Sequence, residues 1–137
     1  MPSKARIKKV SKNSVPATKK PVWITLDGAD SSPGQWICFR NSFSVNKVPA
    51  ADLIVACDTK YWLWINGRMV IREGGLKKGG DPHVTWYDTV PVSSFVKDGV
   101  NTIAILLWYF GRSGYSHHSS SCPALHIRFS KQITGSS

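Results

Sequence analysis

The chain has 137 residues, a length that suits one domain and excludes a second. Of these residues 42% are hydrophobic and six are tryptophan, which is enough for one buried core. Its formal net charge of +10 is concentrated at the N-terminus, where residues 1–20 hold seven basic residues and no acidic residue. The remaining 117 residues carry a net charge of only +3, so a folded basic face for nucleic acid is not predicted and nucleic acid is not an expected partner.

Residues 1–20 are rich in Lys, Ser and Thr and contain only isolated apolar residues, a composition that cannot bury enough surface to offset chain entropy. We expect a disordered basic tail over residues 1–20, a folded domain over residues 21–131 and a disordered C-terminal tail over residues 132–137. No signal peptide is visible, and no run of about 18 apolar residues indicates a membrane span. The localisation stays open, with the cytoplasm expected if the chain is complete, and no membrane partner is expected.

From residue 22 onward, short β-branched and aromatic runs alternate with turn residues, and no window has a helical period. The predicted strands cover residues 22–25, 36–45, 51–58, 61–65, 68–73, 84–90, 101–110 and 123–129. Eight short strands indicate an all-β fold, a jelly roll or another two-sheet sandwich. The run 101–110 lacks polar alternation and is predicted to be a central strand covered on both faces.

The best-defined element is the hairpin around Asn66-Gly67, a dipeptide that favours a two-residue type I′ turn. Such a turn fixes the register, and the predicted pairs are Ile65–Arg68, Trp64–Met69, Leu63–Val70, Trp62–Ile71 and Tyr61–Arg72. One face then carries Trp62, Trp64, Met69 and Ile71, and the other carries Tyr61, Leu63, Ile65, Arg68, Val70 and Arg72. We prefer the tryptophan face as the core; the alternative is a core of Leu63, Ile65 and Val70, with the two tryptophans forming a patch for a partner.

Neither catalysis nor metal binding is indicated by any placed motif. The three cysteines, Cys38, Cys57 and Cys122, are widely spaced and are expected to be buried, reduced thiols. The adjacent His117 and His118 would point to opposite sides of an extended chain and would share one ion poorly. We therefore predict no catalytic residue and no metal site.

The stretch 72–88, REGGLKKGGDPHVTWYD, is a glycine-rich polar segment that leads into Trp86 and Tyr87. Its glycines match no phosphate-binding motif. A polar loop beside aromatic rings suits a sugar, because hydroxyl groups bind charged side chains while the apolar face of the sugar stacks on a ring. An ordinary long loop over an aromatic core is the competing interpretation.

Four segments in order, DTKYWLWINGRMV, REGGLKKG, TWYDTV and NTIAILLWYFGRSGYSHHSS, resemble the N-terminal domain of Bacteroides-type α-L-rhamnosidases over roughly residues 22–129. The resemblance implies a galactose-binding-like β-sandwich that accompanies a separate catalytic barrel, which this chain does not contain. The chain departs from that pattern at Cys122-Pro123 and in its basic tail. Rhamnose-binding modules of such enzymes use calcium, but no ligand set matches here, so calcium stays open and no other cofactor is expected.

We therefore expect a non-catalytic carbohydrate-binding or accessory domain of the α-L-rhamnosidase type, which is not an enzyme by itself. Its expected partners are a carbohydrate, with L-rhamnose or a rhamnose-containing glycan first, and a glycosidase catalytic domain. The site is expected where the loop from Arg72 to Asp88 meets the end of the strand that carries Trp108. The candidate sugar-binding residues are Asp58, Tyr61, Arg72, Glu73, Trp86, Trp108, Tyr109 and His117. The alternative is a structural docking domain, or a fragment of such an enzyme, that binds no sugar.

Overall fold

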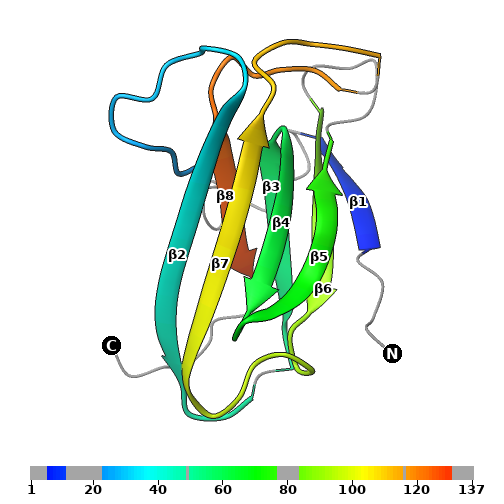
Figure 1. Cartoon of the computed structure of the whole chain (residues 1–137). Helices are drawn as coiled ribbons and strands as arrows, with labels where there is room; N and C mark the ends of the chain where they lie inside the picture. Colours follow the sequence, from blue (N-terminus) through cyan, green and yellow to red (C-terminus); the bar gives the residue numbers. More distant parts are fainter. Residues whose placement is uncertain (1–5, 12–22, 49, 77–83, 116, 131–137) are drawn as a thin grey trace.

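The computed structural model describes residues 6–11, 23–48, 50–76, 84–115 and 117–130, and these residues form strands, turns and loops. The strands are β1 (Arg6–Ser11), β2 (Gln35–Val45), β3 (Asp52–Asp58), β4 (Lys60–Ile65), β5 (Arg68–Gly75), β6 (Val84–Pro91), β7 (Gly99–Tyr109) and β8 (Ala124–Phe129). They make two antiparallel sheets, ordered β1-β6-β3-β8 and β2-β7-β4-β5, which pack face to face (Figure 1). The predicted all-β sandwich is confirmed. Within the described residues there is no helix of the length and apolarity needed to span a membrane.

Seven of the eight predicted strands are present with ends shifted by at most two residues. The eighth prediction, 22–25, falls partly outside the described residues, and its described part makes only an isolated bridge in which Ile24 and Leu125 exchange backbone hydrogen bonds of 2.8 and 2.9 Å.

Strand β1 lies within the stretch that the composition predicts to be disordered, and it pairs along β6 from Arg6 opposite Thr89 to Ser11 opposite Val84. The edge of β6 offers unpaired backbone N–H and C=O groups, and these groups accept a strand whatever its side chains are. Composition alone does not capture this pairing. Residues 1–5, 12–22 and 131–137, which make up the rest of both predicted tails, lie outside the described residues.

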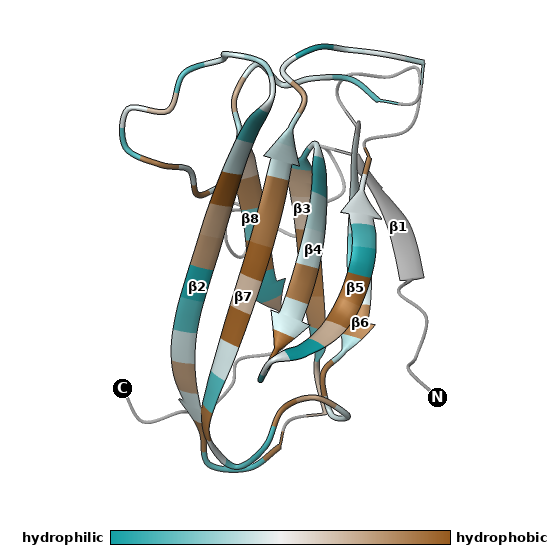
Figure 2. Cartoon of the chain, viewed as in Figure 1, coloured by the Kyte–Doolittle hydropathy of each residue, from teal (hydrophilic) through white to brown (hydrophobic). Residues whose placement is uncertain are grey.

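The core lies between the two sheets, and β4 and β7 contribute alternate residues to it. In β7 the inward side chains are buried, and in β4 Tyr61, Leu63 and Ile65 are at most 1% exposed. Figure 2 shows this apolar character along much of β7 and β3. The other buried apolar residues of this core include Leu53, Val55, Val90, Val92, Ile103, Ile105, Leu107, Tyr109 and Leu125.

The Asn66-Gly67 turn is confirmed, since both residues have positive φ angles, of 51° and 76°. The pairs Ile65–Arg68 and Trp64–Met69 are also as predicted. Beyond them the register shifts, so that Leu63 lies opposite Ile71 and Tyr61 opposite Gly74. The predicted pairs Leu63–Val70, Trp62–Ile71 and Tyr61–Arg72 are therefore wrong, because β-bulges add residues to β5 that a strict two-residue hairpin does not contain.

The preferred assignment of the hairpin faces is also wrong. Tyr61, Leu63 and Ile65 face the core, whereas Trp62 and Trp64 are half-buried on the outer face. The neighbouring strand decides this, because residues 61, 63 and 65 lie opposite the inward residues 107, 105 and 103 of β7. A local pattern that is apolar on both faces does not contain this information.

Strand β7 is central, between β2 and β4, as predicted. It is not covered on both faces, because its residues alternate between buried and half-buried. Leu106 and Trp108 belong to the half-buried outer set, and they are shielded in part by side chains of the adjacent strands and, for Trp108, by Phe110. The long apolar run therefore produces an outer surface that remains partly open.

Candidate functional site

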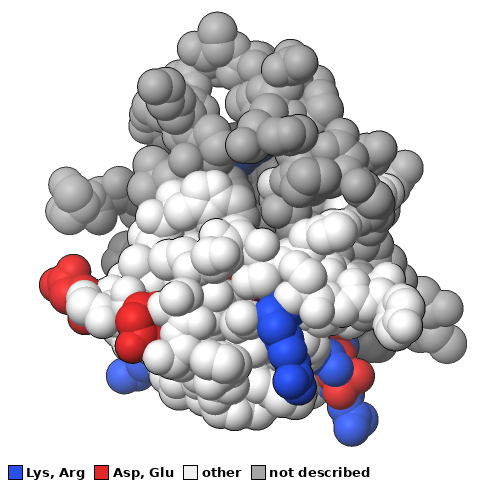
Figure 3. Space-filling model, turned by 90° about the horizontal axis from the view of Figure 1, so that it is seen from above, with Lys and Arg blue, Asp and Glu red and all other residues white. Residues whose placement is uncertain are grey.

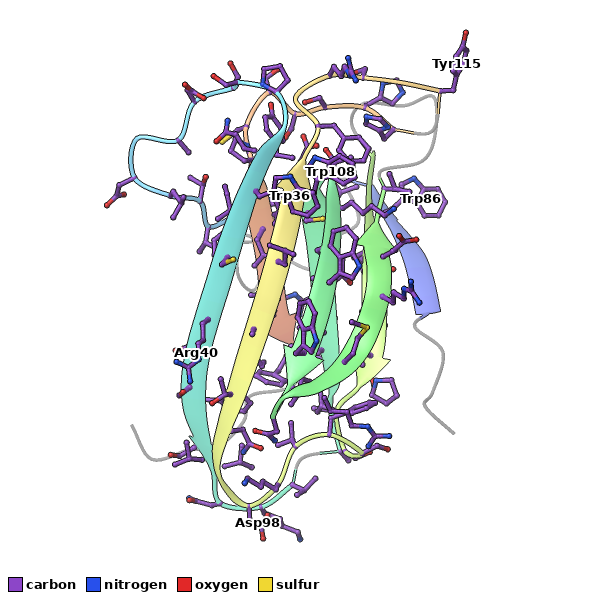
Figure 4. The ribbon with its side chains drawn as sticks, in the orientation of Figure 1. Trp36, Arg40, Trp86, Asp98, Trp108 and Tyr115 are labelled. Atoms are coloured by element: carbon purple, nitrogen blue, oxygen red, sulfur yellow. The ribbon has the colours of Figure 1, made fainter. Side chains whose placement is uncertain are left out.

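An aromatic cluster, comprising Trp36, Trp62, Trp108 and Phe110, covers the outer face of the β2-β7-β4-β5 sheet at one end of the sandwich. Trp36 lies directly opposite Trp108 in the register of β2 and β7, and the two rings stack with centroids 4.8 Å apart and an 11° interplanar angle. Trp62 stacks on Trp36 at 5.7 Å, and Phe110 contacts Trp108 edgewise at 4.6 Å. Trp36 is 52% exposed, so the cluster presents a broad aromatic surface to solvent (Figure 4).

A shallow, open hollow of about 320 Å³ adjoins this cluster at the upper end of the molecule in Figure 1, and we call it the upper-end hollow. It lies between the segments 33–34 and 108–112. Its lining residues are Pro33, Gly34, Trp108, Phe110 and Arg112.

Close contact between two loops builds the upper-end hollow. The backbone N–H of Gly34 donates to the carbonyl of Tyr109 at 3.1 Å. Gly111 has a φ of +75°, and a Cβ atom there would lie 2.5 Å from Cα of Pro33. Both the conformation and the approach therefore require glycine at position 111.

Asp58, at the end of β3, anchors the loop that follows β7. Its carboxylate is only 4% exposed and accepts hydrogen bonds from the backbone N–H and the hydroxyl of Ser120. It also accepts a hydrogen bond from the hydroxyl of Thr59 at 2.7 Å. The Oγ1 of Thr59 in turn accepts a hydrogen bond from the N–H of Phe110 at 3.1 Å. Asp58 therefore supports the hollow from behind rather than facing a ligand.

His117 supports the same loop from within. Its Nε2 donates to the carbonyl of Arg112 at 2.7 Å, and its ring meets Phe110 edgewise at 5.0 Å. With 8% exposure, the imidazole is buried behind the two lining residues. Its position fixes the backbone from which the Arg112 side chain extends.

A charged pair borders the aromatic cluster on the side of β5. Nζ of Lys60 lies 3.4 Å from Oε1 of Glu73 and 5.7 Å from the ring centre of Trp62. In the sheet register Lys60 lies between Trp108 of β7 and Gly75 of β5. The beginning of the predicted sugar-binding loop is thus separated from Trp108 by one strand.

Tyr61 and Asp88 form a buried hydrogen-bonded pair between the sheets. The phenol donates to Oδ2 of Asp88 at 2.6 Å, and the same oxygen accepts the N–H of Gly75 at 3.0 Å. Burial, together with the nearby Asp88 carboxylate, raises the pKa of Tyr61 far above its usual value. The phenol therefore stays protonated and serves as a structural donor.

The structure distributes the predicted site residues over several environments. Trp108 lines the upper-end hollow, and Asp58 and His117 lie behind it. Tyr61 and Tyr109 are fully buried in the core, Arg72 and Glu73 are exposed on β5, and Trp86 is half-buried on β6 of the other sheet (Figure 4). Residues 77–83 of the predicted loop lie outside the described residues.

Sequence reasoning did not select Trp36, Phe110 or Arg112. The available signals were the aromatic start of the 36–45 run and the glycines around position 112, which indicated a loop larger than a connector. No group of three or more His, Cys, Asp or Glu suited to a metal ion occurs in the described part of the chain. Whether calcium binds stays open.

Comparison with known proteins gives matches among solved structures. No protein-family model matches the chain, and no curated protein matches it by sequence. The fold matches the crystal structure of a GH78 family rhamnosidase of Bacillus sp. GL1 with a TM-score of 0.68 and 25% identity, over 87% of this chain and 12% of that one. The α-L-rhamnosidases of Aspergillus terreus and Dictyoglomus thermophilum match with TM-scores of 0.48 and 0.46 and identities of 18% and 22%, over 88% and 94% of this chain and 13% and 14% of theirs.

The match to the GH78 family rhamnosidase confirms the predicted resemblance to the rhamnosidases. The chain is similar to a single domain of a GH78 rhamnosidase and spans about an eighth of the length of that enzyme. The likeness is therefore to one accessory part of a glycoside hydrolase.

Proposed function

We propose that the chain is a non-catalytic accessory domain of the α-L-rhamnosidase type that binds carbohydrate at the upper-end hollow. The observation that supports this most is the wall of the hollow, where Trp108 is stacked on the exposed Trp36 and lies beside Arg112. The apolar C–H face of a sugar ring stacks favourably on such an indole, and a neighbouring charged side chain orients its polar groups.

The dimensions of the hollow suit a weak and small site. Its volume of about 320 Å³ is near the lower limit of small-molecule pockets, so one sugar residue is a better match than a long chain. A few hydrogen bonds and one stacking contact give a binding free energy of about −4 to −6 kcal/mol, which corresponds to millimolar to high micromolar affinity.

The described carboxylates support a non-catalytic role. Glycoside hydrolysis usually uses two carboxylates across a cleft, whereas the described residues that line the hollow include none. Asp58 and Asp88 are buried and committed to structural hydrogen bonds, and Glu73 pairs with Lys60. In this proposal hydrolysis belongs to a separate glycosidase catalytic domain.

One observation favours a second candidate function, that of a docking domain that binds no sugar. The outer face of the β2-β7-β4-β5 sheet continues the aromatic cluster with further apolar side chains, and Met69 is 45% exposed. Cys38, predicted to be buried, is exposed on the same face. Such a continuous apolar surface is typical of an interaction site, and the partner in this candidate is an adjoining glycosidase domain. The half-buried members of this face are Trp62, Trp64, Leu106 and Trp108.

Gel electrophoresis through immobilised polysaccharide, including rhamnose-containing glycans, separates the two candidates. We expect the chain to be retarded, and Trp108→Ala to weaken binding about five- to tenfold because the stacking surface is lost. The matched control is Trp64→Ala, which removes a half-buried tryptophan of the same face away from the hollow and should keep the retardation. If no polysaccharide retards the chain, with or without calcium, the docking candidate is the better one.

A further inference from the structure

Among the residues that the structure describes, the side chains lining the upper-end hollow offer hydrogen-bond donors only. Trp108 has one indole N–H, and Arg112 has the five N–H groups of a guanidinium. Pro33, Gly34 and Phe110 add no polar side-chain atom. The described lining residues therefore contribute no side-chain carboxylate, amide or hydroxyl group that could accept a hydrogen bond from a ligand.

Two backbone carbonyls at the hollow are committed to internal hydrogen bonds. The carbonyl of Arg112 accepts from His117 at 2.7 Å, and the carbonyl of Tyr109 accepts from Gly34 at 3.1 Å. These two acceptors therefore already hold the loops together, which strengthens the donor character of the site.

The guanidinium of Arg112 has no carboxylate within salt-bridge distance in the described part of the chain, where the recorded ion pair is Lys60–Glu73. Seen from above, most of the described surface is uncharged and the acidic side chains lie toward its margin (Figure 3). An anion in the hollow would thus meet an uncompensated positive charge beside an aromatic wall.

The donor-only lining discriminates between classes of sugar. Hydroxyl groups both donate and accept, so a neutral sugar would leave its donors to water in this site. A carboxylate is acceptor-only, and its two oxygens match the forked N–H groups of arginine in a charge-assisted, bidentate pair. The site therefore suits a sugar that carries a carboxylate better than a neutral one.

We propose that the upper-end hollow recognises a uronic acid residue, with its ring on the indole of Trp108 and its carboxylate on the guanidinium of Arg112. This inference rests on the proposed carbohydrate-binding function and specifies its ligand class. The Arg112 side chain is exposed, so the charge contribution is screened by salt while the stacking contribution is not.

Matched pairs of sugars that differ only at C6 test the inference. The whole chain is titrated by NMR with methyl glucuronide against methyl glucoside, and with methyl galacturonide against methyl galactoside, at neutral pH. We expect the uronate of a pair to bind about tenfold more tightly at low salt. The preference should shrink as NaCl rises from about 20 to about 500 mM.

Two variants identify the side chain that causes the preference for uronates. Arg112→Gln keeps polar N–H groups but removes the charge, and it should abolish the uronate preference. The control is Arg40→Gln, which removes an exposed arginine from the lower part of β2 and should leave the preference unchanged (Figure 4). Equal affinity for both members of each pair, lost in Trp108→Ala, would overturn the uronate inference alone. An absence of binding to every sugar would contradict both the inference and the proposed function.

Discussion

Replacing Leu107 by alanine is expected to lower the free energy of unfolding by about 3 to 5 kcal/mol. Leu107 is fully buried near the C-terminal end of β7, opposite Ile37 of β2 and Tyr61 of β4. Truncation removes apolar burial and leaves a cavity that the two sheets cannot close. Urea denaturation followed by tryptophan fluorescence measures the change.

The matched control is the next residue of the same strand, Leu106, which has the same side chain on the half-buried outer face. Leu106→Ala should cost about 1 kcal/mol, because part of that side chain is already in contact with water. Equal losses at the two positions would show that β7 is covered on both faces, contrary to the structure.

Replacing Asp58 by alanine is expected to lower the free energy of unfolding by about 2 to 4 kcal/mol. The buried carboxylate accepts hydrogen bonds from the Thr59 hydroxyl and from the N–H and hydroxyl of Ser120. Its removal leaves these donors unsatisfied and frees the loop that carries Arg112. Sugar affinity should fall together with stability.

Asp27→Ala is the control for charge, because Asp27 is an exposed loop aspartate. It should change stability by no more than about 0.5 kcal/mol. Amide hydrogen exchange at Ser120, whose N–H donates to Asp58, gives a second readout, with faster exchange expected only in the Asp58 variant. Unchanged amide exchange in the Asp58 variant would show that Asp58 does not anchor the loop that follows β7.

Much of the sandwich is predictable because its strands depend on local sequence. Runs of β-branched and aromatic residues end at Gly, Pro, Asp and Asn, and Asn66-Gly67 fixes a turn by its φ angles alone. Seven strands follow from these signals. Strand β1 does not, because its pairing depends on the free edge of β6 rather than on its own composition.

The orientation of the hairpin is not predictable, because both of its faces are apolar. The bulges in β5 and the alignment of residue 63 with Ile105 of β7 decide which face is buried, and both are long-range features.

The sequence predicts the types of residue in the candidate site better than it predicts their positions. Trp108 was selected because aromatic residues near polar loops suit sugars. Asp58 and Tyr61 have the right functional groups but point into the protein, where their hydrogen bonds are satisfied. Arg112 follows Trp108 by four residues, but the hollow that they line also needs the close contact of Gly111 with Pro33, and sequence spacing gives no sign of that contact.

The central claim is that a sugar binds against Trp108, and the tryptophan side chains report on it directly. The six tryptophans give one indole N–H signal each in a ¹⁵N NMR spectrum, assigned by single Trp→Phe variants. Titration with a uronate or a rhamnose-containing oligosaccharide should shift the signals of Trp108 and its stacking partner Trp36, while that of Trp64 stays in place. A saturating sugar that leaves Trp108 unmoved, or that moves Trp64 alone, would contradict the proposed site.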